Sequence, residues 1–152
     1  MTAMVTFSKI TPYQAIREIY KHKRCWSFLY ECIENSQEVV ERDGKIDFNH
    51  FGKVYYINEE EYSWIAGYDG GKISFLQFIK KPVRNSIELV VAEKRSTTKT
   101  KAWFGNVVEY IKKEYPKVKK MTTFPMNDVL REYYKRFGFE NYKMKELKLK
   151  VQ

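Results

Sequence analysis

Several kinds of segment are missing from this 152-residue sequence. No run of residues approaches the ~18 consecutive apolar residues that a membrane-spanning helix needs. The first residues, MTAMVTFSKITPYQ, lack the apolar core of a signal peptide. These absences predict a cytoplasmic protein that has no membrane partner.

Cysteine and histidine are also scarce, with two residues of each. Cys25 and Cys32 fall within one predicted helix, which would separate their α-carbons by about 10 Å, beyond the reach of a disulfide. His22 and His50 lie far apart, with no cysteine or carboxylate at metal-ligand spacing. We therefore expect two buried thiols in a reducing compartment and no metal site.

Well-known catalytic and nucleic-acid-binding motifs are absent as well. The sequence contains no Walker loop, no G-x-S-x-G motif and no zinc-finger, RNP or bZIP pattern. It also contains no repeats and no low-complexity linker. Hydrophobic residues make up 43% of the chain and aromatic residues 16%, which argues against disorder and predicts a single domain over residues 1–152.

Positive charge is plentiful, because 28 lysines and arginines outnumber 19 acidic residues and give a net charge of +9. A charge of this size favours a polyanionic partner, which could be nucleic acid, an acidic protein or a cofactor rich in phosphate. Lysines are concentrated in residues 112–120 and 143–150. Charge alone does not choose among these partners.

Hydrophobic periodicity predicts strands and helices in alternation. The predicted strands cover residues 5–10, 53–57, 62–68, 72–80, 86–92, 118–123 and 142–151. The predicted helices cover about residues 12–24, 25–34, 100–115 and 127–137. Turns are expected at Asp43-Gly44 and at residues 69–71, and Lys81-Pro82 is expected to end the strand before it. This order predicts an α/β fold in which a central mixed sheet carries helices on both faces.

The last predicted helix lies in the stretch NDVLREYYKRFGF, residues 127–139. Asn127 or Asp128 can cap its start, and Gly138 can adopt the left-handed conformation that ends a helix. Phe139 would then return to the core. The apolar residues at helical spacing are Val129, Leu130, Tyr133, Tyr134 and Phe137.

The same stretch matches the pattern N-x-x-A-x-x-x-Y-x-x-x-G-F at four positions, Asn127, Tyr134, Gly138 and Phe139, with Leu130 in place of alanine. It therefore resembles the last helix of the GNAT superfamily of acyl-CoA N-acyltransferases. The resemblance implies a GNAT-like fold for the whole domain. It also implies that Tyr134 lies beside the acyl-CoA sulfur and protonates the departing thiolate.

A second match lies between a predicted strand and the helix that follows it. The family's pyrophosphate loop has the pattern [RQ]-x-x-G-x-[GA], and the matching stretch here is RSTTKT, residues 95–100. Upstream, VVAEKR aligns with the family's V-x-P-x-x-R. The resemblance implies cofactor contacts from the strand, the loop and the last helix, namely from Val90, Val91, Ala92, Arg95, Ser96, Thr97, Thr98, Lys99, Thr100 and Asn127.

Threonine replaces both small residues of that loop, at Thr98 and Thr100. Glycine allows close approach to a pyrophosphate, whereas threonine is β-branched and stiff. Two outcomes follow from the substitution. Either the threonine hydroxyls, together with Arg95, Lys99 and Lys101, bind the pyrophosphate in place of the close backbone approach, or the site no longer binds acyl-CoA.

The resemblance implies transfer of an acetyl group from acetyl-CoA to an amine acceptor that the sequence does not identify. Amides of residues 90–92 would polarise the thioester carbonyl, and Tyr134 would be the proton donor. Glu88 is a candidate base, acting directly or through water, unless it is paired with a nearby lysine or arginine. Two alternatives stay open: a nucleic-acid-binding or nucleobase-modifying protein on the same fold, or a catalytically inactive interaction module. The protein could be a monomer or a homodimer.

Overall fold

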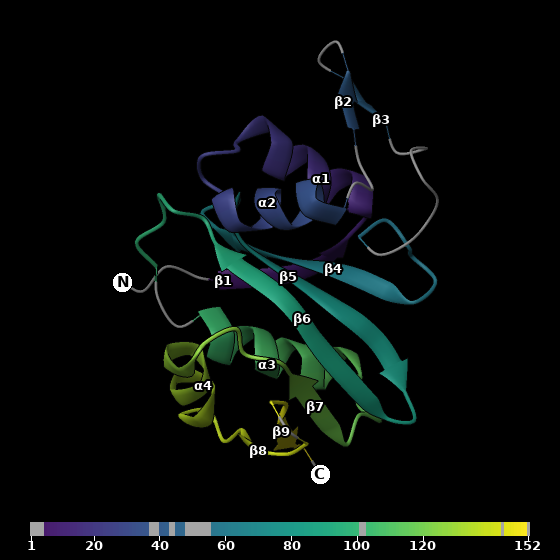
Figure 1. Ribbon diagram of the computed structural model, residues 1–152, viewed down its shortest axis with the longest axis vertical. Coiled ribbons are helices and arrows are strands. Elements are labelled where there is room, and N and C mark those ends of the chain that lie inside the picture. Colours follow the sequence, from purple (N-terminus) through teal and green to yellow (C-terminus); the bar gives the residue numbers. More distant parts are fainter. Residues whose placement is uncertain are drawn as a thin grey trace.

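The computed structural model describes residues 5–36, 40–42, 45–47, 56–100, 103–143 and 145–151, with the backbone alone described for 40–42 and 45–47. Its centre is a seven-stranded sheet with two helices against each face (Figure 1). The elements are β1 (Val5–Ile10), α1 (Pro12–Lys21), α2 (Ser27–Ser36), β2 (Val40–Arg42), β3 (Lys45–Asp47), β4 (Tyr62–Asp69), β5 (Lys72–Val83), β6 (Ser86–Lys94), α3 (Trp103–Glu114), β7 (Lys120–Thr123), α4 (Asp128–Lys135), β8 (Glu140–Asn141) and β9 (Leu147–Lys150).

The strand order in the large sheet is β1-β4-β5-β6-β7-β9-β8, and β2 pairs with β3 in a separate antiparallel pair. Every neighbouring pair in the large sheet is antiparallel except β6 and β7, which run parallel. A parallel pair needs a crossover connection, and α3 provides it. The predicted mixed sheet with helices on both faces is confirmed.

Helix ends follow the local sequence signals. Thr11 caps α1 in a capping box with Gln14, and Pro12 occupies the first turn. Asn127 caps α4, where its side chain accepts a hydrogen bond from the amide of Leu130 at 2.9 Å. Gly138 follows α4 with φ +94°, and Phe139 is buried as predicted.

Each face of the sheet carries its own hydrophobic core. Trp26, just before α2, and residues of α1 and α2 such as Leu29 and Ile33 pack with Trp64 and Phe78 on one face. The other face packs against α3 and the aromatic side of α4. The two faces therefore bury separate clusters, which explains how a chain of this length covers a wide sheet.

The start of α3 is fixed to β4 by a close contact. The Trp103 ring stacks on Phe75, with ring centroids 5.7 Å apart, and lies over Gly67. A Cβ added at Gly67 would lie 2.7 Å from the Trp103 ring and 2.9 Å from Phe7. Only glycine therefore leaves room for the indole at this position.

The prediction that Lys81-Pro82 ends its strand is wrong, because β5 continues through Pro82 to Val83. Pro82 lies between Lys80 and Val83, where the pairing of β5 with β6 is irregular. No ladder hydrogen bond requires a backbone N–H there, so proline is tolerated. Arg84 and Asn85, both with positive φ, then make the tight turn into β6.

Other boundaries also differ from prediction. The tail forms a strand only over β9, after the short β8, and Val129 on α4 is 79% exposed although the pattern predicted an apolar contact. Cys25 and Cys32 are free but half-buried, and burial raises the pKa of the Cys32 thiol. The Asp43-Gly44 turn, residues 53–55 of the predicted strand and Lys101 lie outside the described residues, and residues 56–57 form a turn.

Within the ranges that the structure describes, no helix combines the length and the apolar character needed to cross a membrane.

Candidate functional site

Strands β6 and β7 separate halfway along β6. Their parallel pairing runs only from Ser86 opposite Lys120 to Leu89 opposite Thr123, and the Thr123 hydroxyl donates to the Leu89 carbonyl at 3.0 Å where it ends. Strand β6 continues to Lys94, whereas the chain leaves β7 towards α4. In the described part of the chain, the β7-facing edge of residues 90–94 has no partner strand, so its backbone groups are available to a ligand.

A β-bulge lies at the point of separation. Against β5, Val91 pairs with Phe78 and Leu89 pairs with Ile79, so Val90 is an extra residue in β6. Val90 and Val91 both pack toward α1 and α2, whereas Ala92 packs with the opposite core. Regular alternation in the sequence predicts that Glu88, Val90 and Ala92 share one face. This prediction is wrong for Ala92, because the bulge shifts the alternation by one residue.

Two adjoining clefts open where the strands separate. One, of about 430 Å³, lies between residues 90–94 of β6 and residues 123–127 of the connection to α4. The other, of about 650 Å³, lies between β6, α3 and α4, with Trp103 and Phe104 in its wall. Leu130 and Tyr134 of α4 line both clefts, together with the end of β6.

Tyr134 presents a protonated hydroxyl at this junction. Its ring packs on Phe104, with centroids 4.8 Å apart, and on Phe139. Burial of the phenol, with a smaller contribution from Tyr133, raises the pKa of Tyr134, so the proton is retained at neutral pH. Its hydroxyl makes no hydrogen bond to any residue that the structure describes, which leaves the proton free for a ligand.

The loop after β6 uses its arginine within the protein. Arg95 is 7% exposed, and its Nη1 lies 3.3 Å from Oε2 of Glu18 on α1. Trp26 donates to the same oxygen at 2.9 Å. The Arg95 side chain lines neither cleft, and its Nε is buried without a hydrogen-bond partner among the described residues. The structure thus gives Arg95 a role in joining the loop to α1.

The rest of the loop leaves three backbone amides free. The Ser96 amide donates to the Cys25 carbonyl, and the Thr98 amide donates to the Arg95 carbonyl, each at 3.0 Å. The amides of Thr97, Lys99 and Thr100 donate to no acceptor within residues 5–36, 56–100 and 103–143. Backbone N–H groups of this kind attract anions in a loop that leads into a helix.

The two threonines fit this loop without strain. Neither Thr98 nor Thr100 has a positive φ, so the conformation does not need glycine at either place. The Thr100 hydroxyl donates to the Asp69 carboxylate at the end of β4 and so is not directed at a ligand. The substitution of both small residues is therefore accommodated by the local backbone.

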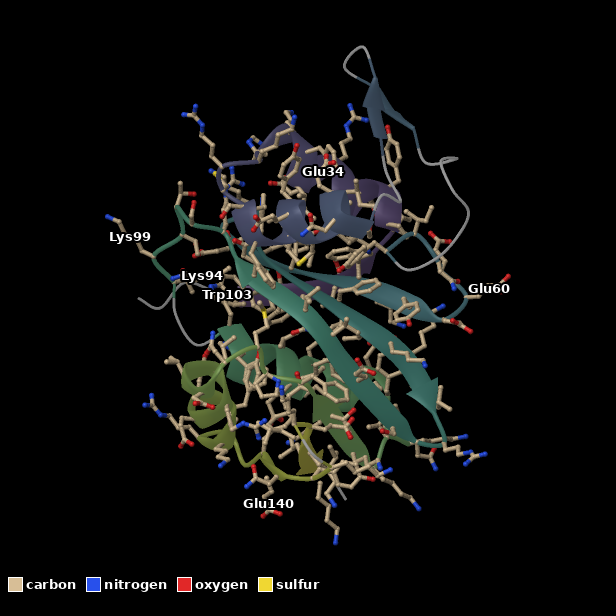
Figure 2. The ribbon with its side chains drawn as sticks, in the orientation of Figure 1. Glu34, Glu60, Lys94, Lys99, Trp103 and Glu140 are labelled. Atoms are coloured by element: carbon tan, nitrogen blue, oxygen red, sulfur yellow. The ribbon has the colours of Figure 1, made fainter. Side chains whose placement is uncertain are left out.

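Three residues that line both clefts were not predicted from the sequence as site residues, namely Glu93, Lys94 and Leu130. Figure 2 shows Lys94 beside Trp103 and Lys99 pointing outward nearby, at the side of the molecule where α3 begins. The Glu93 carboxylate accepts the amides of Phe28 and Leu29 and caps α2, and burial raises its pKa against the effect of those bonds. No local signal marks this cap, because the helix it caps lies 64 residues earlier in the chain.

Glu88 lies outside both clefts, on the paired part of β6. Lys80 stands opposite it on β5 and Thr122 on β7. Burial raises the pKa of Glu88, Lys80 opposes this shift, and the nearby charge of Glu146 adds to it. Glu88 therefore flanks the point of separation, and the structure does not bring it together with Tyr134 in one cleft.

The sequence matches no protein-family model, and no curated protein matches it. Solved structures do resemble the fold. The PaiA N-acetyltransferase of Thermoplasma acidophilum, in complex with coenzyme A, aligns with a TM-score of 0.64 and 11% identity over 97% of this chain and 99% of that one. An acetyltransferase of Thermus thermophilus aligns with a TM-score of 0.62 and 9% identity over 99% and 100%.

A GNAT family acetyltransferase of Elizabethkingia anophelis, with acetyl-CoA bound, aligns with a TM-score of 0.50 and 13% identity over 60% of this chain and 78% of that one. At such low identities the likeness establishes the fold. The chain has the GNAT fold, as the resemblance of its last helix predicted.

Proposed function

We propose that this protein is an N-acyltransferase that takes an acyl group, acetyl in the simplest case, from acyl-CoA and gives it to an amine. The observation that carries the proposal is the separation of β6 from β7, which opens a cleft with an unpaired strand edge on one side and the protonated Tyr134 on the other. The binding of coenzyme A by proteins of the same fold supports it.

The residues present fit the pantetheine arm and thioester of such a cofactor. A thioester supplies an electrophilic carbonyl and a thiolate leaving group. The strand edge at residues 90–92 offers backbone groups, and Leu130 offers an apolar wall. For the pyrophosphate, the amides of Thr97, Lys99 and Thr100, which donate to no described acceptor, and the ammonium groups of Lys94 and Lys99 replace the contact that Arg95 would have made.

The roles of the other residues follow from where they lie. Amides of Val90, Val91 and Ala92 polarise the carbonyl. Tyr134 gives its proton to the departing sulfur, and Glu88 accepts the amine proton through water, since it lines neither cleft. Asn127 positions α4 by capping it at the mouth of the first cleft.

Calorimetric titration with acetyl-CoA tests the proposal, with desulfo-CoA to measure binding of the phosphate-bearing part alone. Lys94→Ala and Lys99→Ala should each weaken binding by about tenfold, as expected for a lost charge-assisted contact. Lys113→Ala, at the exposed far end of α3, is the matched control and should bind normally. No binding at millimolar acetyl-CoA would overturn the proposal and favour an inactive interaction module.

A further inference from the structure

Three lysines converge on one tyrosine away from the two clefts. The ammonium groups of Lys120, Lys148 and Lys143 lie 4.6, 4.8 and 5.3 Å from the ring centroid of Tyr142. Lys120 also donates to the Tyr142 hydroxyl at 3.0 Å, and this hydrogen bond, with a smaller contribution from Lys143, lowers the pKa of that phenol. We call these four residues the Tyr142 cluster.

Among the described residues, no ion pair neutralises the Tyr142 cluster, although Glu140 stands opposite Lys148 in the strand pairing. In the described part of the chain, no carboxylate lies within 4 Å of any of the three ammonium groups. Like charges held this close repel one another, and cation–π contacts offset the repulsion only partly. An anion placed among the ammonium groups would relieve that repulsion, and the Tyr142 hydroxyl gives it a further polar partner.

The Tyr142 cluster lies on the same face of the sheet as Glu88. Strand register places Glu88 opposite Thr122, and Thr122 opposite Lys148. Neighbouring strands are about 4.8 Å apart, so the Cα atoms of Lys148 and Glu88 are separated by roughly 10 Å. Met121 and Leu147, the residues just before Thr122 and Lys148, face the α3 side instead.

Glu146 brings a second carboxylate to this face. Glu146 follows Tyr142 in the chain, and its carbonyl accepts a hydrogen bond from the Tyr142 amide at 3.1 Å. The negative charge of the Glu146 side chain contributes to the raised pKa of Glu88. Glu88 therefore lies at one end of the face and the three ammonium groups at the other, with Glu146 next to Tyr142. A ligand with a positive and a negative group roughly 10 Å or less apart would satisfy both ends.

We propose that the acyl acceptor is a small molecule that carries both an amine and an anionic group, either a carboxylate or a phosphate. This inference rests on the proposed function. The amine lies by Glu88, and the Tyr142 cluster holds the anion. The amine nitrogen bonds to the acyl carbon as the carbon–sulfur bond breaks, the amine proton passes to Glu88 through water, and the thiolate takes the proton of Tyr134.

The first experiment measures the anion site without any turnover. Inorganic phosphate is titrated into the protein while phenolate absorbance is recorded, with Tyr142→Phe used to isolate the Tyr142 signal. Bound phosphate should raise the pH at which Tyr142 ionises, and Lys143→Ala combined with Lys148→Ala should weaken phosphate binding at least tenfold. Lys145→Ala, an exposed lysine nearby, is the control. Equal phosphate binding by all variants would overturn the inference.

The second experiment compares hexylamine, 6-aminohexanoate and 6-aminohexyl phosphate as acceptors. The two anionic amines should have kcat/KM values about tenfold or more above that of hexylamine, and the double lysine variant should remove this preference mainly through KM. Bound acetyl-CoA without a preference for anionic amines would overturn this inference and leave the proposed function standing. Phosphate binding without acetyl-CoA binding would overturn both.

Nucleic acid is the other partner that such a cluster could serve. A single-stranded oligonucleotide that competes with phosphate at the Tyr142 cluster, while the anionic amines do not, would overturn the acceptor inference in favour of a nucleic-acid surface.

Discussion

Tyr134 combines a ring fixed in an aromatic cluster with a hydroxyl that no described residue engages. Tyr134→Phe removes only that hydroxyl, so the free energy of unfolding should change by less than about 0.5 kcal/mol. Turnover should fall by about 10²-fold or more if the hydroxyl protonates the thiolate. Kinetics and denaturant unfolding on the same preparation check both parts. Unchanged turnover would exclude the donor role.

The raised pKa of Glu88 leads to a prediction of how the stability of the protein depends on pH. Its pKa in the folded protein lies above the ordinary 4.5, so the folded state holds the proton more tightly than the unfolded chain does. Its contribution to stability is therefore complete below the unfolded pKa and is lost as pH rises through the folded pKa. Glu88→Gln should consequently be more stable than the parent at pH 7, with the difference shrinking near pH 4.

The same Glu88→Gln variant should lose about 10²-fold or more in turnover if Glu88 is the base. Denaturant unfolding at the two pH values and acyl-transfer assays provide the measurements. A variant that is less stable than the parent at pH 7 would show instead that Glu88 serves mainly as the ion-pair partner of Lys80.

Arg95 was predicted as a cofactor ligand, and the structure makes it a partner of Glu18. Removing one member of a buried pair is destabilising by about 3–5 kcal/mol, so Arg95→Ala should unfold at much lower denaturant concentration. Lys99→Ala, at an exposed position in the same loop, should leave stability unchanged. An Arg95→Ala protein of normal stability would show that the pair contributes little.

At the level of single residues, the sequence predicts Tyr134 and Asn127 as candidate site residues because the last helix carries its own signals of spacing and capping. It gives no local signal for Glu93 and Lys94, which line the clefts, or for the Tyr142 cluster. Their surroundings come from segments far apart in the chain, as when Lys120, Tyr142 and Lys148 meet across strands. Nor can it show that Arg95 turns toward α1, because an exposed loop arginine and a buried one look alike in a sequence.

At the level of elements, the contact between α3 and β4 depends on Gly67. Gly67→Ala would place a methyl group 2.7 Å from the Trp103 ring, so the ring must shift and stability should fall by about 1–3 kcal/mol. Trp103→Phe combined with Gly67→Ala should recover part of the loss, and a double-mutant cycle in denaturant measures the coupling. Strictly additive effects would show that the ring and the glycine are not in contact.

Element prediction succeeds where the signal is local and fails where neighbouring strands decide. The capping box of α1 and the glycine after α4 can be read from a few adjacent residues. Strand β5 continues through Pro82 because pairing with β6 resumes at Val83, opposite Ser86. A proline in a strand pattern ordinarily indicates an end, and only the partner strand shows that its missing N–H is tolerated here.

At the level of the whole molecule, the +9 charge leaves acyl-CoA and nucleic acid as competing partners. Acetyl-CoA at 100 times its Kd should raise the free energy of unfolding by about 2.7 kcal/mol, visible as a concentration-dependent rise in Tm. Binding of a random duplex should weaken steeply and log-linearly with salt. Tight duplex binding at physiological salt, with no response of Tm to acetyl-CoA, would favour the nucleic-acid alternative.

The bulge at Val90 has a consequence for how the gene tolerates deletions. If one codon between those for Leu89 and Ala92 were lost, β6 would regain regular alternation, and the later residues of the strand would keep their faces and their partners on β5. Glu93 would therefore still cap the start of α2. A single-codon deletion elsewhere in the paired part of β6 would instead turn the side chains beyond it to the other face, so this short stretch should tolerate the loss of one residue far better than the rest of the strand does.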